Sequence, residues 1–494
     1  MKLFKLFLFF IITFTLVLIL AKPGLNQSGT QSNTTVPNPI NTNPEPVDGK
    51  GNLGSRNRVD RKAVEQIIQQ APPQQAIQTF EELQAVEFAR QLGINFYGST
   101  TSAEQIAQDL CNLAETTGKK TALIYVISLE QELQLFLVLP NPKPCNDPAT
   151  KQNKDNLLII RQVIPEANRQ NLQEIVREFR AGITDVIRRN RYQKPGQKLY
   201  QWIIEPFKVP LLANQIDTLV FCMDSGLRSL PIAALYDGEK FLIEEYSVGL
   251  IPSFSLTDIR YFPIIKTPIL AMGISKSTEN QSPLPAVAVE VPTLANILWQ
   301  GKGFLNEEST IDKLQSLSRQ ESFRIIHIAT HAEFKPGKLA ESYIQFWNSK
   351  LRLDRLKLLS RQLGWNESPK VEMLVLSACR TAVGSEQAEL GFAGLAVQAG
   401  VKTAVGSLWY ASDEGSLALM TEFYNKLKNG PIKTEGLREA QLAMLKAQVR
   451  VEKGELVLSD NLRLPLPPEL ANSSETSFSH PYYWSGYTMI GNWN

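Results

Sequence analysis

The sequence predicts an α/β fold with a mostly parallel sheet. Two short apolar runs, residues 325–329 and 371–376, have the length and continuous apolar character of strands that are buried on both faces. From about residue 198 onward, further strand-like runs alternate with segments of helical spacing, which is the pattern of a sheet flanked by helices. In open α/β sheets ligands bind past the carboxyl ends of the strands, so the residues after these two runs are the first candidates for a site.

The amino terminus departs from the ordinary composition of the chain. Residues 1–21 begin with two lysines and continue as an almost uninterrupted apolar run, which leaves no polar face for a surface helix. We expect either a cleaved signal peptide or a transmembrane anchor. Cleavage after Ala21 would put Ile19 where small residues are required, which slightly favours the anchor. In both cases the lysines stay cytoplasmic, so we expect the folded part to be extracytoplasmic, on the periplasmic side, either membrane-anchored or secreted.

Two regions separate this segment from the predicted sheet. Residues 22–57 are rich in Asn, Gln, Gly, Ser, Thr and Pro, so they bury too little apolar surface to fold and are expected to be a disordered polar linker. Residues 58–195 are expected to form a mixed α/β region. Its helical spacing occurs at 63–70, 80–92, 103–117 and 168–189, and two strand-like runs at 121–128 and 133–139 predict a hairpin.

Charge and cysteine content narrow the range of functions. Fifty-one basic and 49 acidic residues leave a formal charge of +2, and no nucleic-acid-reading motif occurs, so nucleic acid is not an expected partner. Cys222 lies in the apolar run TLVFC and is expected to be a buried core residue. Cys111 and Cys145 could pair in an oxidising compartment, but the sequence does not place them within bonding distance.

The reactive residues that follow the two buried runs are His331 and Cys379. Neighbouring parallel strands would set this imidazole and this thiol side by side, and the imidazole would take the thiol proton to make a nucleophilic thiolate. His331 lies 48 residues before Cys379, which follows Ala378. Caspases likewise have a histidine about 50 residues upstream of a cysteine that follows an alanine. The two residues are therefore the candidate catalytic base and nucleophile of a cysteine peptidase.

Longer motifs occur around the two residues and in a fixed order. They are LYQWIIEPF, DSGLRSLPIAALYDGEKFL, HIATHAEF, LSACRTAVG, ELGFAGLAVQAGVKTAVGSLWYASDEGS, EAQLAML and HPYYWSGYTMIG. Together they resemble the CHAT family, which consists of caspase-like domains related to separase and often found beside tetratricopeptide repeats. The resemblance implies a CHAT domain over residues 196–494, folded as a caspase-like α/β/α sandwich. No repeat with a period of about 34 residues occurs, so the chain departs from the family's usual means of recruiting partners.

The resemblance also implies roles for further residues. In caspase-like enzymes the oxyanion is held by the backbone N–H groups of the nucleophile and of the residue after the histidine, here Cys379 and Ala332. The motif LWYASD resembles a separase motif whose last Asp binds the basic side chain before the scissile bond, so Asp413 is the candidate substrate-binding residue. The alternative is an N-cap, in which Ser412 or Asp413 opens the helix 414–427, and capping and substrate binding are compatible. Glu386 and Glu389 are second-choice acidic partners, with solvated loop charges as their simpler explanation.

The remaining histidines and aromatic residues have simpler explanations. His327 lies inside its strand and is expected to be a satisfied core histidine that supports the site, and a zinc site is not expected because HExxH chemistry needs a helix. His480 is expected to pack near the last strand. The aromatic residues Trp484, Tyr487 and Trp493 are expected in the core, on a strand that covers an edge of the sheet. A helix is expected over residues 288–299, with Pro292 tolerable only in its first turn.

These observations favour a cysteine endopeptidase that needs no cofactor or metal and cleaves protein or peptide substrates after a basic residue. One alternative is a catalytically silent CHAT module that acts as a membrane-tethered protein-interaction scaffold. Another is a hydrolase or acyltransferase that uses the same dyad. An enzyme that works only with an activator is a further possibility, and the sequence names no regulatory partner.

Overall fold

The computed structural model describes residues 60–92, 100–142, 144–145, 159–335, 339–365, 371–381, 394–430, 432–471 and 476–494. The predicted signal peptide or anchor at residues 1–21 and the predicted linker at 22–57 lie outside the described residues. Among the described helices, none has the length and apolar character needed to cross a bilayer.

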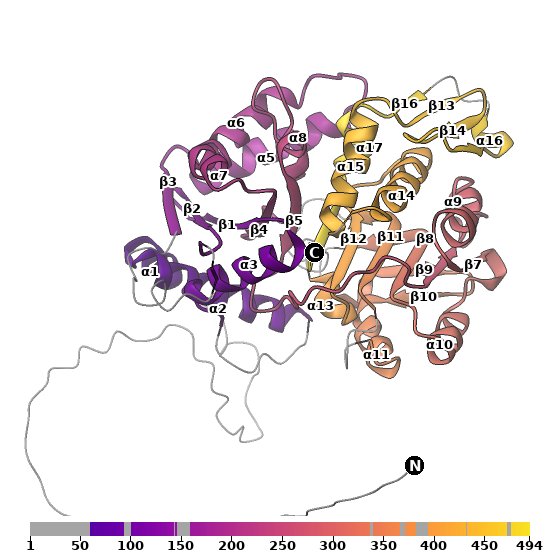
Figure 1. Ribbon diagram of the computed structural model, residues 1–494, viewed down its shortest axis with the longest axis horizontal. Coiled ribbons are helices and arrows are strands. Elements are labelled where there is room, and N and C mark those ends of the chain that lie inside the picture. Colours follow the sequence, from indigo (N-terminus) through magenta and orange to yellow (C-terminus); the bar gives the residue numbers. More distant parts are fainter. Residues whose placement is uncertain are drawn as a thin grey trace, which may run out of the picture. The chain divides into compact units, whose positions relative to one another are not determined.

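A sheet of 13 strands runs through the described part of the chain (Figure 1). Its strand order is β10-β9-β8-β11-β12-β17-β5-β4-β1-β2-β3, with β6 paired to β8 and β7 paired to β6. The strands are β1 (Thr121–Ser128), β2 (Leu133–Val138), β3 (Ile159–Ile164), β4 (Thr218–Met223), β5 (Ser247–Ile251), β6 (Ile269–Gly273), β7 (Gly301–Leu305), β8 (Ile325–Phe334), β9 (Tyr343–Phe346), β10 (Ser349–Arg352), β11 (Met373–Thr381), β12 (Thr403–Ser407) and β17 (Tyr487–Gly491).

The sheet consists of two halves whose strands run in opposite directions. In the first half β1, β4, β5 and β17 are parallel to one another, and in the second half β6, β7, β8, β11 and β12 are parallel. The halves meet at an antiparallel pair, β12 with β17. The carboxyl ends of the two sets of strands therefore lie at opposite edges of the sheet. This arrangement confirms the predicted α/β class with a mostly parallel central sheet, and the β1–β2 hairpin is also confirmed.

Helices cover both sides of the sheet. In Figure 1, α1–α3 lie opposite α5–α8 across the first half, and α9 and α14 lie opposite α10, α11 and α13 across the second. Helix α15 lies beside α14 and packs on β5. The helices are α1 (Arg61–Gln70), α2 (Pro73–Leu92), α3 (Ala103–Thr117), α5 (Arg169–Thr184), α6 (Gln193–Ile203), α7 (Lys208–Ala213), α8 (Leu242–Glu245), α9 (Val287–Thr293), α10 (Ile311–Gln320), α11 (Leu353–Gln362), α13 (Leu395–Ala399), α14 (Asp413–Leu427), α15 (Lys433–Leu445), α16 (Pro468–Ala471) and α17 (Pro481–Trp484).

A second, smaller sheet follows α15. Its strand order is β15-β14-β13-β16, and its strands are β13 (Arg450–Glu452), β14 (Glu455–Val457), β15 (Arg463–Pro465) and β16 (Thr476–Ser477).

The last strand of the large sheet lies at its centre. β17 pairs with β12 on one side and with β5 on the other, so the prediction that it covers a sheet edge is wrong. Trp484, Tyr487 and Trp493 are at most 1% exposed, which confirms them as core residues. A strand with both faces buried gains from aromatic side chains as much as an edge strand does, because packing decides where such residues are favoured.

Helix α9 differs from its prediction in the position of its proline. The helix begins at Val287, so Pro292 lies beyond the first turn and inside the helix. The chain then continues as a π-helical turn, Leu294–Leu298. A proline cannot donate to the carbonyl four residues earlier, and a local π turn re-satisfies backbone groups next to such a break. The expectation about Pro292 is therefore wrong, although the helix itself is present.

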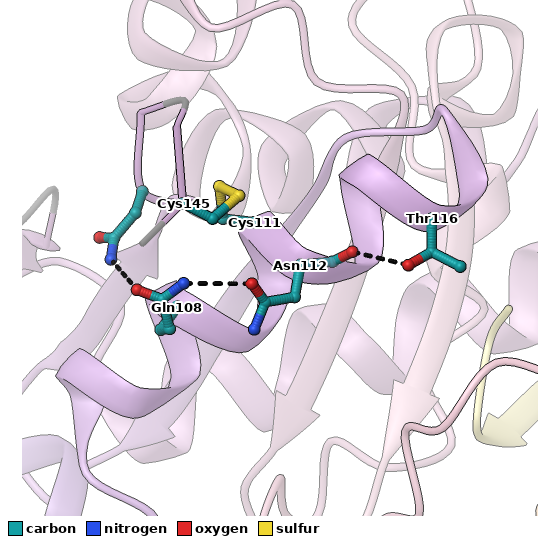
Figure 2. Close-up of a disulfide and its surroundings, with 6 residues drawn as sticks. Gln108, Cys111, Asn112, Thr116 and Cys145 are labelled. Atoms are coloured by element: carbon teal, nitrogen blue, oxygen red, sulfur yellow. Dashed lines mark hydrogen bonds between the residues drawn. A yellow bond between two sulfur atoms is a disulfide. The ribbon is translucent and has the colours of Figure 1, made fainter. Parts of the chain in front are cut away.

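A disulfide joins α3 to the segment that follows β2. Cys111 and Cys145 are bonded, with their Cα atoms 5.6 Å apart. Figure 2 shows the bond beside Gln108, whose amide donates to Asn112 Oδ1 at 3.1 Å and whose Oε1 accepts from Asn141 at 3.3 Å. The bond closes a loop between positions 34 residues apart. Cys222 is a buried free thiol, as predicted, and burial raises its pKa well above the ordinary value.

Candidate active site

The site is built on the ladder between β8 and β11. Up to Leu376, which pairs with Ile328, the two strands are in simple register. The register then shifts, and Ala378 pairs with His331 and Cys379 with Ala332. The shift is a β-bulge in which β8 contains one residue more than β11, and bulges next to active sites re-aim the side chains that follow them.

The half-buried imidazole of His331 is held by one backbone group. Its Nε2 lies 2.8 Å from the carbonyl oxygen of Ser282. A carbonyl oxygen can only accept, so Nε2 carries the hydrogen and Nδ1 is the nitrogen that can take up a proton. This contact fixes both the tautomer and the ring plane of the imidazole.

The structure describes the backbone of Cys379 but not its side chain. Its position in the ladder puts its backbone beside that of Ala332, on a neighbouring strand about 4.8 Å away. Ala332 is buried and also pairs with Ile344 of β9. Glu386 and Glu389, the second-choice acidic partners, lie outside the described residues.

Asp413 begins helix α14, but it does not cap that helix. The N-cap is Ser412, whose hydroxyl accepts from the backbone N–H of Gly415 at 3.2 Å. The Asp413 carboxylate instead accepts from the N–H of Ala286, the residue before α9, at 2.8 Å. Ala286 lies four residues after Ser282, so one short stretch of chain contacts both His331 and Asp413.

The electrostatic surroundings of Asp413 are unusual for a carboxylate. Burial raises its pKa to about 7, the Ala286 N–H opposes the rise, and the carboxylates of Glu290 and Glu414 add to it. Among the described residues, no lysine or arginine forms an ion pair with Asp413. A half-buried carboxylate without a cation is suited to receive a positively charged ligand group.

His327 is buried and bonded on both ring nitrogens. Its Nε2 lies 2.9 Å from Glu290 Oε1, and its Nδ1 lies 3.3 Å from the hydroxyl of Tyr424. This confirms the expectation of a satisfied core histidine. In the part of the chain that the structure describes, no cluster of histidine, cysteine and acidic residues could hold a metal ion.

Three residues of this region, Glu290, Ser282 and Ser377, are not part of the prediction from the sequence. Glu290 accepts a hydrogen bond from Ser377 Oγ at 2.5 Å, in addition to its contact with His327. A usable signal was present for Glu290, because it is the lone acid in the apolar run AVAVEVP. Charged residues are almost never fully buried unless they are paired, so an acid in such a run indicates a buried partner. No comparable signal marks Ser282, whose contribution is a backbone carbonyl.

His480 caps a helix and contacts the backbone elsewhere. Its Nδ1 accepts from the N–H of Tyr482 at 3.2 Å, and its Nε2 lies 3.2 Å from the carbonyl of Arg189. Burial lowers its pKa below the ordinary value. It therefore has no part in the candidate site.

Comparisons with known proteins identify the family. A model of the CHAT domain matches residues 193–492, which is more than half of the chain. The chain belongs to the CHAT domain family. This agrees with the resemblance to caspase-like cysteine peptidases drawn from the motifs, and the matched residues include β8, β11 and α14.

The chain is also similar in structure to the separase in the crystal structure of the Saccharomyces cerevisiae separase–securin complex. The sequence identity is 9% and the TM-score is 0.44, over 89% of this chain and 34% of that one. The CHAT protein thus spans about a third of the length of that separase chain, since it covers 34% of it. No curated protein sequence matches it significantly.

Proposed function

We propose that this CHAT protein is a cysteine endopeptidase in which His331 and Cys379 form a catalytic dyad, and that it cleaves after a basic residue. The observation that supports this most directly is the register of β8 and β11. The bulge sets Ala378 opposite His331 and Cys379 opposite Ala332, at the carboxyl ends of two neighbouring parallel strands. Residues 48 positions apart in the sequence are thereby adjacent in the sheet.

The proposed reaction uses the free nitrogen of His331. Nδ1 takes the proton of the Cys379 thiol, and the thiolate attacks the carbonyl carbon of the substrate peptide bond. The imidazolium then gives this proton to the leaving amine as the C–N bond breaks, which leaves an acyl thioester on Cys379. Nδ1 next takes a proton from water, whose oxygen attacks the thioester, and the thiol leaves with that proton. The Ser282 carbonyl stabilises the imidazolium in both steps by accepting from Nε2–H.

We assign the oxyanion donors to the backbone N–H groups of Cys379 and Ala332. Their support is the ladder, which places the two residues opposite each other. Backbone amides in a sheet are held rigidly, so they need no reorganisation as negative charge develops on the carbonyl oxygen.

The basic specificity is assigned to Asp413. Its carboxylate is half-buried, lacks a cationic partner among the described residues, and is connected to His331 through the stretch from Ser282 to Ala286. A guanidinium or ammonium group before the scissile bond would supply the missing cation through charge-assisted hydrogen bonds.

We further propose that the folded part works outside the cytoplasm. The Cys111–Cys145 disulfide supports this, because such bonds persist in oxidising compartments and are rare in the cytosol. The apolar segment at residues 1–21 would direct export, as a signal peptide or as an anchor.

The test uses the full-length protein and fluorogenic peptides that end in Arg, Lys, Asp or Leu. We expect cleavage after Arg and Lys that falls to background in both Cys379→Ala and His331→Ala. Cys222→Ala is the matched control, because it removes a buried thiol in the first half of the sheet, where Cys222 contacts the carbonyl of Pro252. This variant should keep full activity.

Two outcomes would contradict parts of the proposal. Cleavage after Leu or Asp alone, still dependent on Cys379, would refute the role of Asp413 and keep the dyad. A folded wild-type protein that cleaves nothing and does not react with a peptidyl thiol-directed electrophile would refute the peptidase and favour the silent scaffold.

A further inference from the structure

A buried carboxylate connects the two strands that carry the dyad. Glu290 is 1% exposed and extends from α9 to β8 and β11. Its Oε1 contacts His327 Nε2 at 2.9 Å and Ser377 Oγ at 2.5 Å. His327 lies four residues before His331 on β8, and Ser377 lies two residues before Cys379 on β11.

The hydrogen-bond roles in this group are determined by its chemistry. An ionised Glu290 can only accept, so Ser377 and His327 Nε2–H both donate to it. The Tyr424 hydroxyl serves the other nitrogen of His327 at 3.3 Å. Three polar side chains that are at most 1% exposed thus satisfy one another without water.

The bulge depends on the same residues. Ser377 is the single β11 residue opposite two residues of β8, and pairing with β12 has already ended at Val375. Its carbonyl accepts from the hydroxyl of Tyr487 on β17. That hydroxyl has one hydrogen, so Ser416 Oγ, 2.8 Å away, donates to the tyrosine oxygen. The hydroxyl and the carbonyl of Ser377 are therefore both fixed by side chains from other elements.

Close packing of α9 on β6 brings the Glu290 carboxylate within hydrogen-bonding distance of β8 and β11. A Cβ atom on Gly273 of β6 would lie 2.5 Å from Val287 and 2.7 Å from Val291, both on α9. The absence of a side chain at this position lets α9 approach the sheet, and Glu290 lies on the helix between these two valines.

Stability alone does not account for a buried carboxylate here. Replacing a buried ion pair by well-packed apolar side chains is often neutral or stabilising, whereas a polar group that bonds two elements fixes their relative position. Apolar packing would leave β8 and β11 free to slide back into simple register. Such a slip would place Cys379 opposite His331 instead of Ala332, and would separate the two backbone N–H groups proposed to hold the oxyanion.

We propose that Glu290 is a positioning residue: by holding His327 and Ser377, it fixes the bulged register that sets Cys379 opposite Ala332 and Ala378 opposite His331. The inference rests on the dyad proposed above. Glu290 is not a catalytic residue, since it touches neither substrate nor the reacting atoms, and its effect should reach the reaction through the two strand ends.

The experiment measures the full-length protein with Glu290→Gln and Ser377→Ala. Gln keeps the shape but turns one acceptor into a donor, and Ala removes a single hydroxyl, so the second variant serves if the first does not fold. Glu81→Gln is the matched control, because Glu81 is equally buried and accepts from the hydroxyls of Tyr125 at 2.9 Å and Ser255 at 2.7 Å in the first half of the sheet.

Two readouts separate positioning from stability. The first is kcat and KM on an Arg peptide, and the second is the pH profile of Cys379 alkylation by iodoacetamide, located by peptide mapping. Cys222 is buried and Cys111 and Cys145 are bonded, so they do not compete for the reagent. We expect Glu290→Gln to lower kcat about 10- to 100-fold with KM within about twofold. We also expect it to slow alkylation at neutral pH, with a smaller effect for Ser377→Ala and none for Glu81→Gln.

The result that overturns the inference is a folded Glu290→Gln protein whose kcat and alkylation profile match the wild type. His331→Ala distinguishes this from failure of the dyad. If it alters the alkylation of Cys379 and Glu290→Gln does not, the dyad stands and the positioning role is wrong. If neither variant alters alkylation, the dyad is wrong and the positioning role is refuted with it.

Discussion

In the first half of the sheet, arginines form ion pairs at the carboxyl ends of the strands. In the second half, one carboxylate and several hydroxyl groups form hydrogen bonds at the corresponding ends. Asp224, directly after β4, is 1% exposed, pairs with Arg61 and accepts from the N–H of Ser128 at 3.0 Å. Arg228 is 2% exposed and donates to Glu87 at 2.8 Å. Each of these two buried charges is matched by an opposite one.

The second half leaves its reactive groups unmatched. Among the described residues, His331 has one hydrogen-bond partner, a backbone carbonyl, and Asp413 has no cation. The difference indicates that the two halves of the sheet have different roles. Ion pairs and a disulfide stabilise the first half, and the second half keeps groups that can change protonation or receive a ligand. Burial raises the pKa of Asp413 to about 7, and a carboxyl group with a perturbed pKa is typical of a functional site.

The largest expected effect comes from Asp224→Ala. It removes the buried acceptor of the Ser128 N–H and one of the carboxylates paired with Arg61, which keeps Glu65, and this should lower the free energy of unfolding by about 3 to 5 kcal/mol. The kcat of the folded fraction should stay unchanged. Urea unfolding and peptide cleavage measure the two quantities. A drop in kcat comparable to that of Glu290→Gln would show that both halves position the dyad, and the comparison would fail.

The next effect is loss of the disulfide in the double variant Cys111→Ser/Cys145→Ser. The bond restricts the unfolded chain between positions 34 residues apart, so its removal should cost about 2 to 4 kcal/mol of stability. Activity at low temperature should remain, because α3 packs beside β1 and β2, and these two strands are far from β8 and β11 in the strand order. A midpoint of urea unfolding equal to that of the wild type would contradict the stabilising role.

A smaller effect is expected from Gly273→Ala. The new methyl would lie 2.5 Å from Val287, so α9 must move away from β6, at a cost of about 1 to 3 kcal/mol. Because Glu290 moves with α9, kcat should fall as well. Gly118→Ala is the matched control in the first half, since its φ of 73° strains any side chain although nothing lies within 4 Å. It should cost about 1 kcal/mol and leave kcat unchanged.

The smallest effect is the pH dependence of specificity. The pKa of Asp413 is raised to about 7, so the carboxyl is neutral below that pH and charged above it. The ratio of kcat/KM for an Arg peptide to that for its neutral citrulline counterpart should rise about tenfold per pH unit below 7 and level off above it. Titration of the dyad affects the cleavage of both substrates equally, so it cancels in this ratio. A ratio independent of pH, or one unchanged in Asp413→Asn, would remove Asp413 from the substrate pocket.

Much of the fold could be predicted because several strands have local signals. β8 and the described part of β11 are buried on both faces, so their apolar runs are continuous and easy to recognise. The β1–β2 hairpin is short-range. The place of β17 could not be predicted, because its partners β12 and β5 are distant in the sequence and the pattern of one strand does not specify its neighbours.

The site shows the same limit. Strand ends indicated His331 and Cys379, and the ladder places their backbones together, whereas the dyad chemistry and the oxyanion donors stay predictions. The bulge, the Ser282 carbonyl and the contacts of Glu290 depend on how α9 packs on the sheet. Sequence rules describe an element and its caps, but these contacts arise between elements and have no local pattern.

The central place of β17 has a consequence for synthesis. A ribosome makes this strand after every other strand that the structure describes. Until then β12 and β5 lack the strand that pairs with both of them and joins the two halves. Tyr487, which holds the carbonyl of Ser377, also emerges only then. A nascent or prematurely terminated chain therefore contains the histidine and the cysteine without the geometry that would make them work. The order of translation would therefore keep the proposed peptidase inactive until β17 has been made.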